Sequence, residues 1–166
     1  MKKIINVSTG EVKLGLGDTI LRSSAIGSCI VIVAYNLSEK AGVMAHVMLP
    51  GSAPEDGIDK TRYAADAINQ LIDIMPGAKL PKSNIEACLI GAANVLKIKD
   101  ETICQANIDS ITNILKEKNI SVKALVLGRA MRKTVSMDIG TGFICYTEGN
   151  REEKVLWKAW NESGKQ

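Results

Sequence analysis

The chain has 166 residues, which is enough for one domain to bury a core without disulfides or metals. Apolar residues make up 46% of it and aromatic residues only 4%, so the core must be built from aliphatic side chains. Its net charge of +3 is spread among acidic neighbours, which argues against a nucleic-acid-binding protein, because such proteins need a concentrated basic face. No apolar run reaches the ~18 residues that cross a bilayer, and none forms a signal-peptide core. We therefore predict one domain over residues 1–166, in the cytoplasm, with no membrane insertion.

The first half of the chain predicts strands followed by a helix. Strand-like segments lie at Ile4–Val7, Cys29–Tyr35 and Gly42–Leu49. A loop rich in Pro, Gly and Asp follows at residues 50–59. Apolar residues then recur at helical spacing from Thr61 to Met75, and Asp59 is placed to cap that helix.

The second half alternates strand and helix. A buried strand is expected in Ile85–Leu96, an amphipathic helix in residues 102–119, and a strand in residues 122–128. Thr102 and Gln105 stand at the spacing of a capping box. Residues 134–149 read as a hairpin, and the tail can carry a last short element. Because strands outnumber helices, we predict an α+β fold with two main helices packed on one side of largely antiparallel sheet.

Cysteine and histidine usage argues against a metal site. The four cysteines contain no C-x-x-C pair, and a single histidine cannot complete a common Cys/His zinc site. In the cytoplasm the thiols are expected to be reduced. Three of them, Cys88, Cys104 and Cys145, are interpreted as small buried hydrophobic residues.

The remaining cysteine, Cys29, can meet the only histidine, His46, across a hairpin. A four-residue loop at Asn36–Glu39 places the two directly opposite each other, with Cβ atoms ~5 Å apart. A two-residue loop makes Val31 the partner of His46 and leaves Cys29 as a diagonal neighbour on the same face. A three-residue loop sends the two side chains to opposite faces. The pair is therefore either a nucleophile with its base or two residues of a core hairpin.

A cysteine nucleophile needs this arrangement. A free thiol is mostly protonated at neutral pH, and an imidazole within reach can take its proton and return it to a leaving group. A third group usually orients the imidazole, and the local hydroxyls are Ser23, Ser24 and Ser28. Gly27 is expected to let backbone N–H groups turn toward an oxyanion.

The segment "IGSCIVIVAYNLSEKAGVMAHVMLPGS" resembles the CheD chemoreceptor glutamine deamidases of bacterial and archaeal chemotaxis. The resemblance rests on Gly-Ser-Cys before a valine-rich strand, on the four-residue turn, on Gly-x-x-Ala-His-x-Met-Leu-Pro, and on the seventeen-residue interval from Cys to His. Further matches are "RYAADAINQLI", "EACLIGAANVL", Asn107 and "DIGTGFICY". The similarity is colinear over roughly residues 10–148.

The resemblance implies hydrolysis of protein glutamine side chains to glutamate without a cofactor or metal. Cys29 matches the nucleophile, His46 the base, and Ser23 the position where the family usually has the threonine of the triad. Backbone N–H groups at Gly27 and Ser28 are then expected to hold the oxyanion. The implied fold is a layered ββα sandwich, and the implied partners are chemoreceptor cytoplasmic helices and the phosphatase CheC.

Departures from the family pattern leave two other functions open. The family's Gly-Gly-Ala is "GAA" at Gly91–Ala93, and its late glycine and arginine motif is reduced to "GRAMRK" from Gly128. A divergent relative can be a non-catalytic binding module that docks on CheC or on receptor helices. It can also be a cysteine amidase or transglutaminase-like enzyme that acts on another protein.

Overall fold

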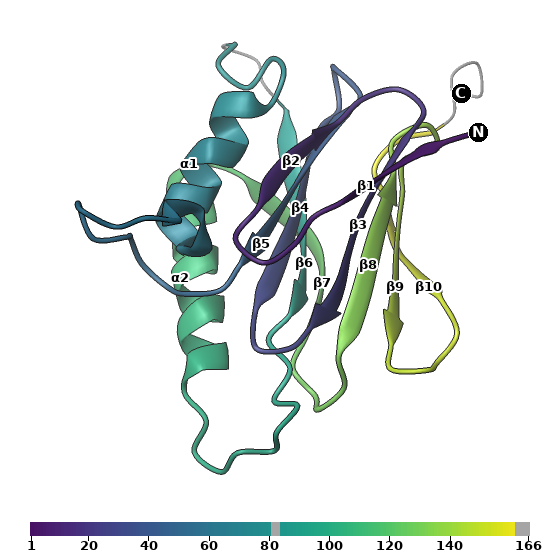
Figure 1. Cartoon of the computed structure of the whole chain (residues 1–166). Coiled ribbons are helices and arrows are strands. Elements are labelled where there is room, and N and C mark those ends of the chain that lie inside the picture. The colour runs from purple at the N-terminus through teal and green to yellow at the C-terminus, as the bar shows by residue number, and fades with distance from the viewer. Residues whose placement is uncertain (81–83, 162–166) are drawn as a thin grey trace.

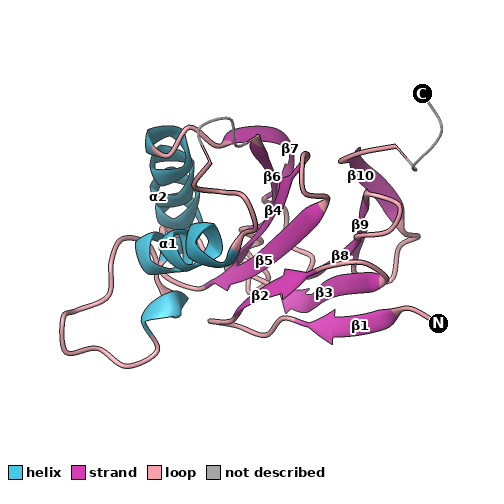
Figure 2. Ribbon diagram, turned by 90° about the horizontal axis from the view of Figure 1, so that it is seen from above, coloured by secondary structure: helices cyan, strands magenta, loops and turns pink. Residues whose placement is uncertain are grey.

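Two five-stranded sheets and two helices form three layers in the computed structural model, which describes residues 1–80 and 84–161 (Figure 1). Both helices cover one face of the middle sheet, and the outer sheet packs against its other face (Figure 2). Each sheet contains one parallel pair beside antiparallel pairs. The α+β, layered ββα prediction with mixed sheets and helices on one side is confirmed.

The middle layer is a sheet whose central strands are buried on both faces. Its strands are, in spatial order, β2 (Val12–Gly15), β5 (Ala41–Val47), β4 (Ile30–Asn36), β6 (Ile85–Gly91) and β7 (Ser121–Leu127). Every residue of β4 and β5 is buried. Such strands need apolar side chains at successive positions, which explains the unbroken run "IVIVAY".

The outer sheet is buried on one face only. Its strands are, in spatial order, β1 (Lys3–Asn6), β3 (Thr19–Ile26), β8 (Lys133–Asp138), β9 (Phe143–Glu148) and β10 (Lys154–Lys158). In β8 buried and half-buried residues alternate, as expected when one face packs and the other meets solvent. The predicted hairpin of residues 134–149 is formed by β8 and β9.

The two helices lie where the hydrophobic periodicity places them, but their N-termini are capped differently. They are α1 (Ala64–Ile74), after a short 3₁₀ helix, η1 (Lys60–Arg62), and α2 (Ile103–Glu117). Asp59 makes no capping hydrogen bond, and Tyr63 is the N-cap residue of α1. The predicted capping box at Thr102 is wrong as well, because the Glu101 carboxylate accepts the Cys104 N–H instead.

The register of the β4–β5 hairpin corrects one prediction. Asn36 pairs with Ala41, and His46 faces Val31 rather than Cys29. The pairing of His46 with Val31 is the one expected for a two-residue loop, although the observed loop between Asn36 and Ala41 has four residues. Cys29 is therefore a diagonal neighbour of His46, and such neighbours lie about 7–8 Å apart. The sequence patterns also missed β2 and β3, the second of which carries Ser23.

No helix in residues 1–80 and 84–161 is both long and apolar enough to cross a bilayer.

Candidate active site

A hydrogen bond between the two sheets fixes the only histidine of the chain. His46 lies on β5 in the middle sheet and is 3% exposed, and Ser23 lies opposite on β3 in the outer sheet and is 2% exposed. Ser23 Oγ and His46 Nδ1 are 2.8 Å apart. The Ser23 hydroxyl also donates to the Val7 carbonyl over 2.6 Å. The structure therefore brings two of the predicted site residues together.

These two contacts determine which ring nitrogen of His46 carries the proton. A serine hydroxyl has one proton, and that of Ser23 goes to the Val7 carbonyl. Ser23 Oγ must then accept the hydrogen bond from His46, so the proton of the neutral ring is on Nδ1. Nε2 keeps a free lone pair. The imidazole is thus held in the tautomer that a general base requires.

Burial keeps His46 neutral. It lowers the pKa of the imidazole, and the Val7 carbonyl opposes this effect only in part. An uncharged imidazole at neutral pH can accept a proton, which a permanently protonated ring could not do.

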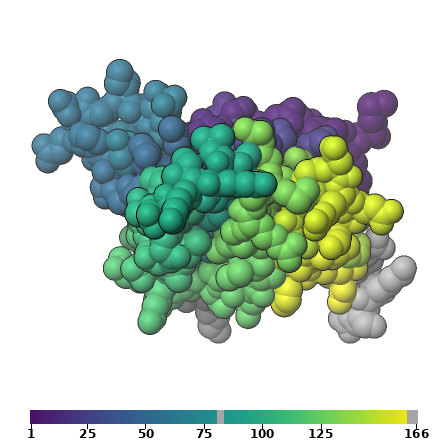
Figure 3. Space-filling model, turned by 90° about the horizontal axis from the view of Figure 1, so that it is seen from below, coloured from purple at the N-terminus to yellow at the C-terminus, as the bar shows by residue number. Residues whose placement is uncertain are grey.

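Cys29 lies just before β4, at the wall of a pocket of about 340 Å³. Seen from below, the teal loop that follows β6 lies beside the green loop that leads into β8, and both line this pocket (Figure 3). Its apolar wall includes Val95, Leu96 and Ile98, and Arg132 adds a positive charge. Burial raises the pKa of the Cys29 thiol, so the thiol is protonated at neutral pH.

Cys29 and His46 open into different pockets that share one wall. His46 lines a second pocket of about 290 Å³, and Ala25 lines both. Ala25 lies in a bulge of β3 and has a φ of 54°, a left-handed conformation that is rare for alanine. Among the described residues, no hydrogen bond joins the thiol to the imidazole. The structure thus places them as neighbours, not as a closed dyad.

The segment around Cys29 is held by its backbone. Ala92 N–H donates to the Cys29 carbonyl and Ala93 N–H to the Gly27 carbonyl, each over 2.8 Å. Gly91 makes this approach possible, because a Cβ atom there would lie 2.2 Å from the Cys29 carbonyl oxygen. Its φ of 134° is also a conformation that other residues rarely adopt. The "GAA" segment at Gly91–Ala93 therefore holds the backbone of the segment that carries the thiol.

The two residues before Cys29 are placed differently from each other. Gly27 has no left-handed φ, and an added Cβ would meet only Val95 Cγ2 at 3.6 Å. Neither backbone conformation nor space requires glycine at this position. Ser28 is exposed and lines the pocket of Cys29. The contribution of Gly27 and Ser28 to an oxyanion site stays a prediction.

A buried lysine holds the loop beside the Cys29 pocket, and no pattern in the sequence pointed to it. Lys133 is 1% exposed, and its Nζ donates to the Gly128 carbonyl over 2.6 Å and to the Met131 carbonyl over 3.4 Å. Burial lowers the pKa of this amine. The lysine thus holds the backbone of the loop that contains Arg132, one of the residues that line the pocket.

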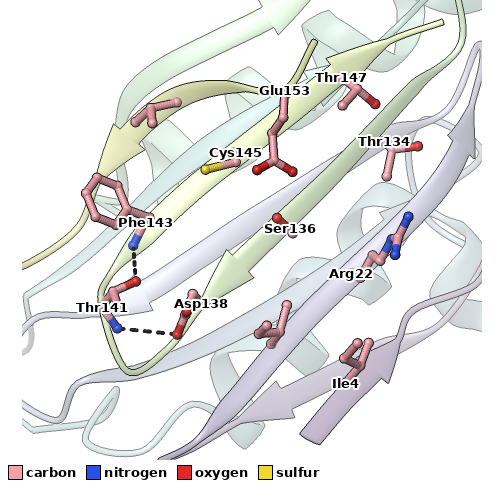
Figure 4. A pocket seen from close by; sticks show the side chains of 12 residues that line it. Ile4, Arg22, Thr134, Ser136, Asp138, Thr141, Phe143, Cys145, Thr147 and Glu153 are labelled. Atoms are coloured by element: carbon pink, nitrogen blue, oxygen red, sulfur yellow. Dashed lines mark hydrogen bonds between the residues drawn. The ribbon is translucent and has the colours of Figure 1, made fainter. Parts of the chain in front are cut away.

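The other three cysteines are free thiols without a histidine partner. Cys88 is buried, and Cys104 is 8% exposed and lines the same pocket as Cys29. Cys145 is only half-buried and lies in a cavity of about 540 Å³ on the open face of the outer sheet. Figure 4 shows it there with Arg22, Glu153 and several threonines. This cavity is larger than the pocket of Cys29, but it contains no histidine.

Comparison with known protein families supports the family resemblance that the sequence motifs indicated. Residues 48–147 match the family model CheD, described as CheD chemotactic sensory transduction. The match spans most of the chain but begins after Cys29 and His46.

Three similar curated proteins align with nearly the whole chain. A protein of Chlorobium luteolum is 37% identical over 150 residues, which are 90% of this chain and 75% of that protein. One of Desulfitobacterium hafniense is 29% identical over 165 residues, covering 94% of this chain and 100% of the relative. One of Methanococcus vannielii is 25% identical over 154 residues, covering 92% and 99%. All three carry the name "Probable chemoreceptor glutamine deamidase CheD".

Proposed function

The chain belongs to the CheD family, and from this premise we propose that it is a glutamine deamidase that converts glutamine side chains of chemoreceptors to glutamate and releases ammonia. In this proposal Cys29 is the nucleophile, His46 the general base and acid, and Ser23 the residue that orients His46. One observation carries the assignment more than any other. The Ser23–His46 hydrogen bond leaves Nε2 of a neutral imidazole unprotonated, next to the pocket of a thiol.

The first half of the reaction forms a thioester. His46 Nε2 accepts the proton of the Cys29 thiol while Sγ bonds to the carboxamide carbon of the substrate glutamine. The same proton then passes to the amide nitrogen, the C–N bond breaks, and ammonia leaves. Because both groups start neutral, the proton moves during the attack rather than before it.

The second half hydrolyses the thioester. His46 Nε2 takes a proton from water, the hydroxide bonds to the acyl carbon, and the C–S bond breaks. The proton returns to Sγ, and the side chain leaves as glutamate. In both halves the charge on the acyl oxygen is stabilised by backbone N–H groups at Gly27, Ser28 and Cys29, which act as an oxyanion hole.

The thiol and imidazole must come together when substrate binds. Catalytic hydrogen bonds are often long in free enzymes and tighten only in the substrate complex. Ala25 is the residue that lines both pockets. We propose that the substrate side chain enters the pocket of Cys29 and reaches the imidazole past this residue.

The proposed substrates are the cytoplasmic helices of chemoreceptors, which places the enzyme in the cytoplasm. The phosphatase CheC is the proposed regulatory partner. The apolar residues at the rim of the pocket, Leu96 and Ile98, support the binding of an amphipathic helix, because they are 77% and 52% exposed.

The test is mass spectrometry of receptor cytoplasmic fragments incubated with the wild-type protein, with Cys29→Ala and with Cys145→Ala. Cys145 lies on the open face of the outer sheet, outside the pocket of Cys29, and is a matched control for loss of a thiol. Conversion of glutamine to glutamate by the wild type and by Cys145→Ala, but not by Cys29→Ala, is the expected result. No conversion by the folded wild type while it binds the fragment would favour the binding module instead. Conversion of generic glutamine peptides but not of receptor fragments would favour the amidase.

A further inference from the structure

Asn107 joins the segment that carries the thiol to the end of the strand that carries the imidazole. It is completely buried, one turn into α2. Its Nδ2 donates to the Ser28 carbonyl and to the Met48 carbonyl, each over 3.2 Å. Ser28 directly precedes Cys29, and Met48 follows His46 by two residues. One side-chain amide therefore spans both halves of the proposed active site.

The contact with Ser28 also fixes the direction of the next N–H group. A peptide bond is planar and trans, so the Ser28 carbonyl and the Cys29 N–H point in opposite directions. Because Asn107 holds the carbonyl, the N–H points away from α2. The Cys29 N–H belongs to the residue that carries the thiol, and its hydrogen bond lowers the pKa of Cys29, although burial raises it more. A donor at that place is suited to the oxyanion that forms when Sγ bonds to a carbonyl carbon.

The carbonyls of Gly27, Ser28 and Cys29 all accept hydrogen bonds, but from two different parts of the fold. The segment after β6 donates Ala93 N–H to the Gly27 carbonyl and Ala92 N–H to the Cys29 carbonyl. Asn107 holds the middle carbonyl from the helix. Without it, the peptide between Ser28 and Cys29 could rotate while its two neighbours stayed in place.

Packing alone does not explain an asparagine at this position. Its other polar atom, Oδ1, is buried and has no hydrogen-bond partner in the part of the chain that the structure describes. A buried acceptor without a partner loses its water with no compensation, which offsets the gain from the two hydrogen bonds. A leucine would fill the same volume without that loss. What leucine lacks is a donor for the two carbonyls.

We propose, on the basis of the deamidase function above, that Asn107 is a positioning residue of the active site. It aims the Cys29 N–H at the oxygen of the reacting carbonyl group and sets the spacing between Cys29 and His46. It contacts no substrate atom and acts entirely through the two backbone carbonyls.

Two variants and one matched control test this role. Asn107→Leu removes both donors, and Asn107→Asp keeps the shape but turns an acceptor toward the carbonyls. Asn113→Asp makes the same chemical change at an exposed position of α2. Thermal unfolding reports folding, turnover of a receptor fragment gives kcat and KM, and alkylation of Cys29 by iodoacetamide is followed against pH without substrate.

The expected result is a fall in kcat by about tenfold or more for both Asn107 variants with KM nearly unchanged, because the loss is one of transition-state stabilisation. Their alkylation profiles should move to higher pH, and Asn113→Asp should match the wild type. Folded Asn107 variants with wild-type kcat and alkylation profiles would overturn the proposal. So would failure of both variants to fold, since Asn107 would then hold the fold rather than the site.

The deamidase function and the role of Asn107 can fail separately. If the wild-type protein does not deamidate receptor fragments, the alkylation profile still decides whether Asn107 controls the surroundings of Cys29. If the wild type deamidates and the Asn107 variants do so equally well, only the positioning role is lost.

Discussion

At the scale of single residues, the direction of one hydroxyl proton determines the chemistry available to His46. Ser23 donates to Val7 and accepts from His46 Nδ1, so the base on Nε2 depends on an oxygen at position 23. Ser23→Ala should lower kcat by about tenfold to a hundredfold, because the imidazole loses its fixed tautomer and orientation. Ser23→Thr keeps the oxygen and is the matched control, with activity near that of the wild type. Equal kcat values for the two variants would contradict this role.

The pH dependence of the reaction follows from the two pKa shifts. Burial lowers the pKa of His46 and raises that of Cys29, so both groups are neutral over a wide pH range. As pH rises, kcat/KM should increase through the lowered pKa of His46, which is below the usual ~6.5 of a histidine. Alkylation of Cys29 by iodoacetamide should increase only above the usual ~8.5 of a thiol. An alkylation midpoint below neutral pH would instead indicate a preformed thiolate–imidazolium pair.

The residues with side-chain chemistry were predictable from the sequence, but their backbone partners were not. Cys29 and His46 could be proposed because a thiol and an imidazole are recognisable by type. Ser23 was one of three local hydroxyls, and only the family resemblance singled it out. The Val7 carbonyl and the left-handed Ala25 could not be named, since any residue has a carbonyl and alanine rarely adopts that conformation. Asn107 could be noted from the family pattern, whereas its contacts with Ser28 and Met48 required the fold.

At the scale of elements, the end of β6 supports the segment that carries Cys29. Gly91→Ala should destabilise the protein by about 3 kcal/mol or more, because the new Cβ would meet the Cys29 carbonyl and the φ is unfavourable. Gly27→Ala is the matched control, since its Cβ would meet only Val95 at an ordinary contact distance. Chemical denaturation measures both. A Gly91→Ala variant as stable as Gly27→Ala would contradict the close approach of the two segments.

The failure of the sequence patterns to detect β3 has a physical cause. Of the inward positions on β3, Thr19 and Ser23 are polar, and a bulge after Ser23 breaks the alternation before Ile26. Hydrophobic periodicity therefore had no signal to detect. The four-residue loop at Asn36–Glu39 would place the β4–β5 register two residues away from the observed one. The observed loop also has four residues but begins one residue later, because loop composition does not determine at which residue the strand pairing ends.

At the scale of the whole molecule, the proposed site lies at the seam between the two sheets, where Ser23 of β3 meets His46 of β5. The loop between β6 and α2 lines the pocket of Cys29, with Leu96 exposed at its rim. A second exposed apolar residue, Ile58, lies on the loop before η1 and outside the pocket. The two residues allow a test of which surface meets the substrate.

Leu96→Asp should raise KM for a receptor fragment by about tenfold, which is ~1.4 kcal/mol of binding free energy, because an apolar contact with the substrate helix is replaced by a charge. Stability should change by less than about 0.5 kcal/mol, since the side chain is on the surface. Ile58→Asp should leave KM unchanged. Steady-state kinetics of both variants decide the matter, and an equal effect of the two changes would contradict a substrate contact confined to the rim.

The layered arrangement as a whole followed from the sequence better than the site did. Unbroken apolar runs marked the strands that are covered on both faces, and the helical spacing of apolar residues marked the two covering helices. Long, strongly patterned elements are determined locally, whereas a site built at a seam depends on how distant elements meet.

The most direct measurement is interception of the acyl-enzyme. A receptor cytoplasmic fragment is incubated with the wild-type protein or with Cys29→Ala in the presence of hydroxylamine, and the fragment is mapped by mass spectrometry. A thioester on Cys29 predicts that hydroxamate replaces glutamate at the same glutamine positions, with the wild type only. Glutamate formed at the wild-type rate by Cys29→Ala, or glutamate undiminished by hydroxylamine, would contradict a covalent intermediate on Cys29.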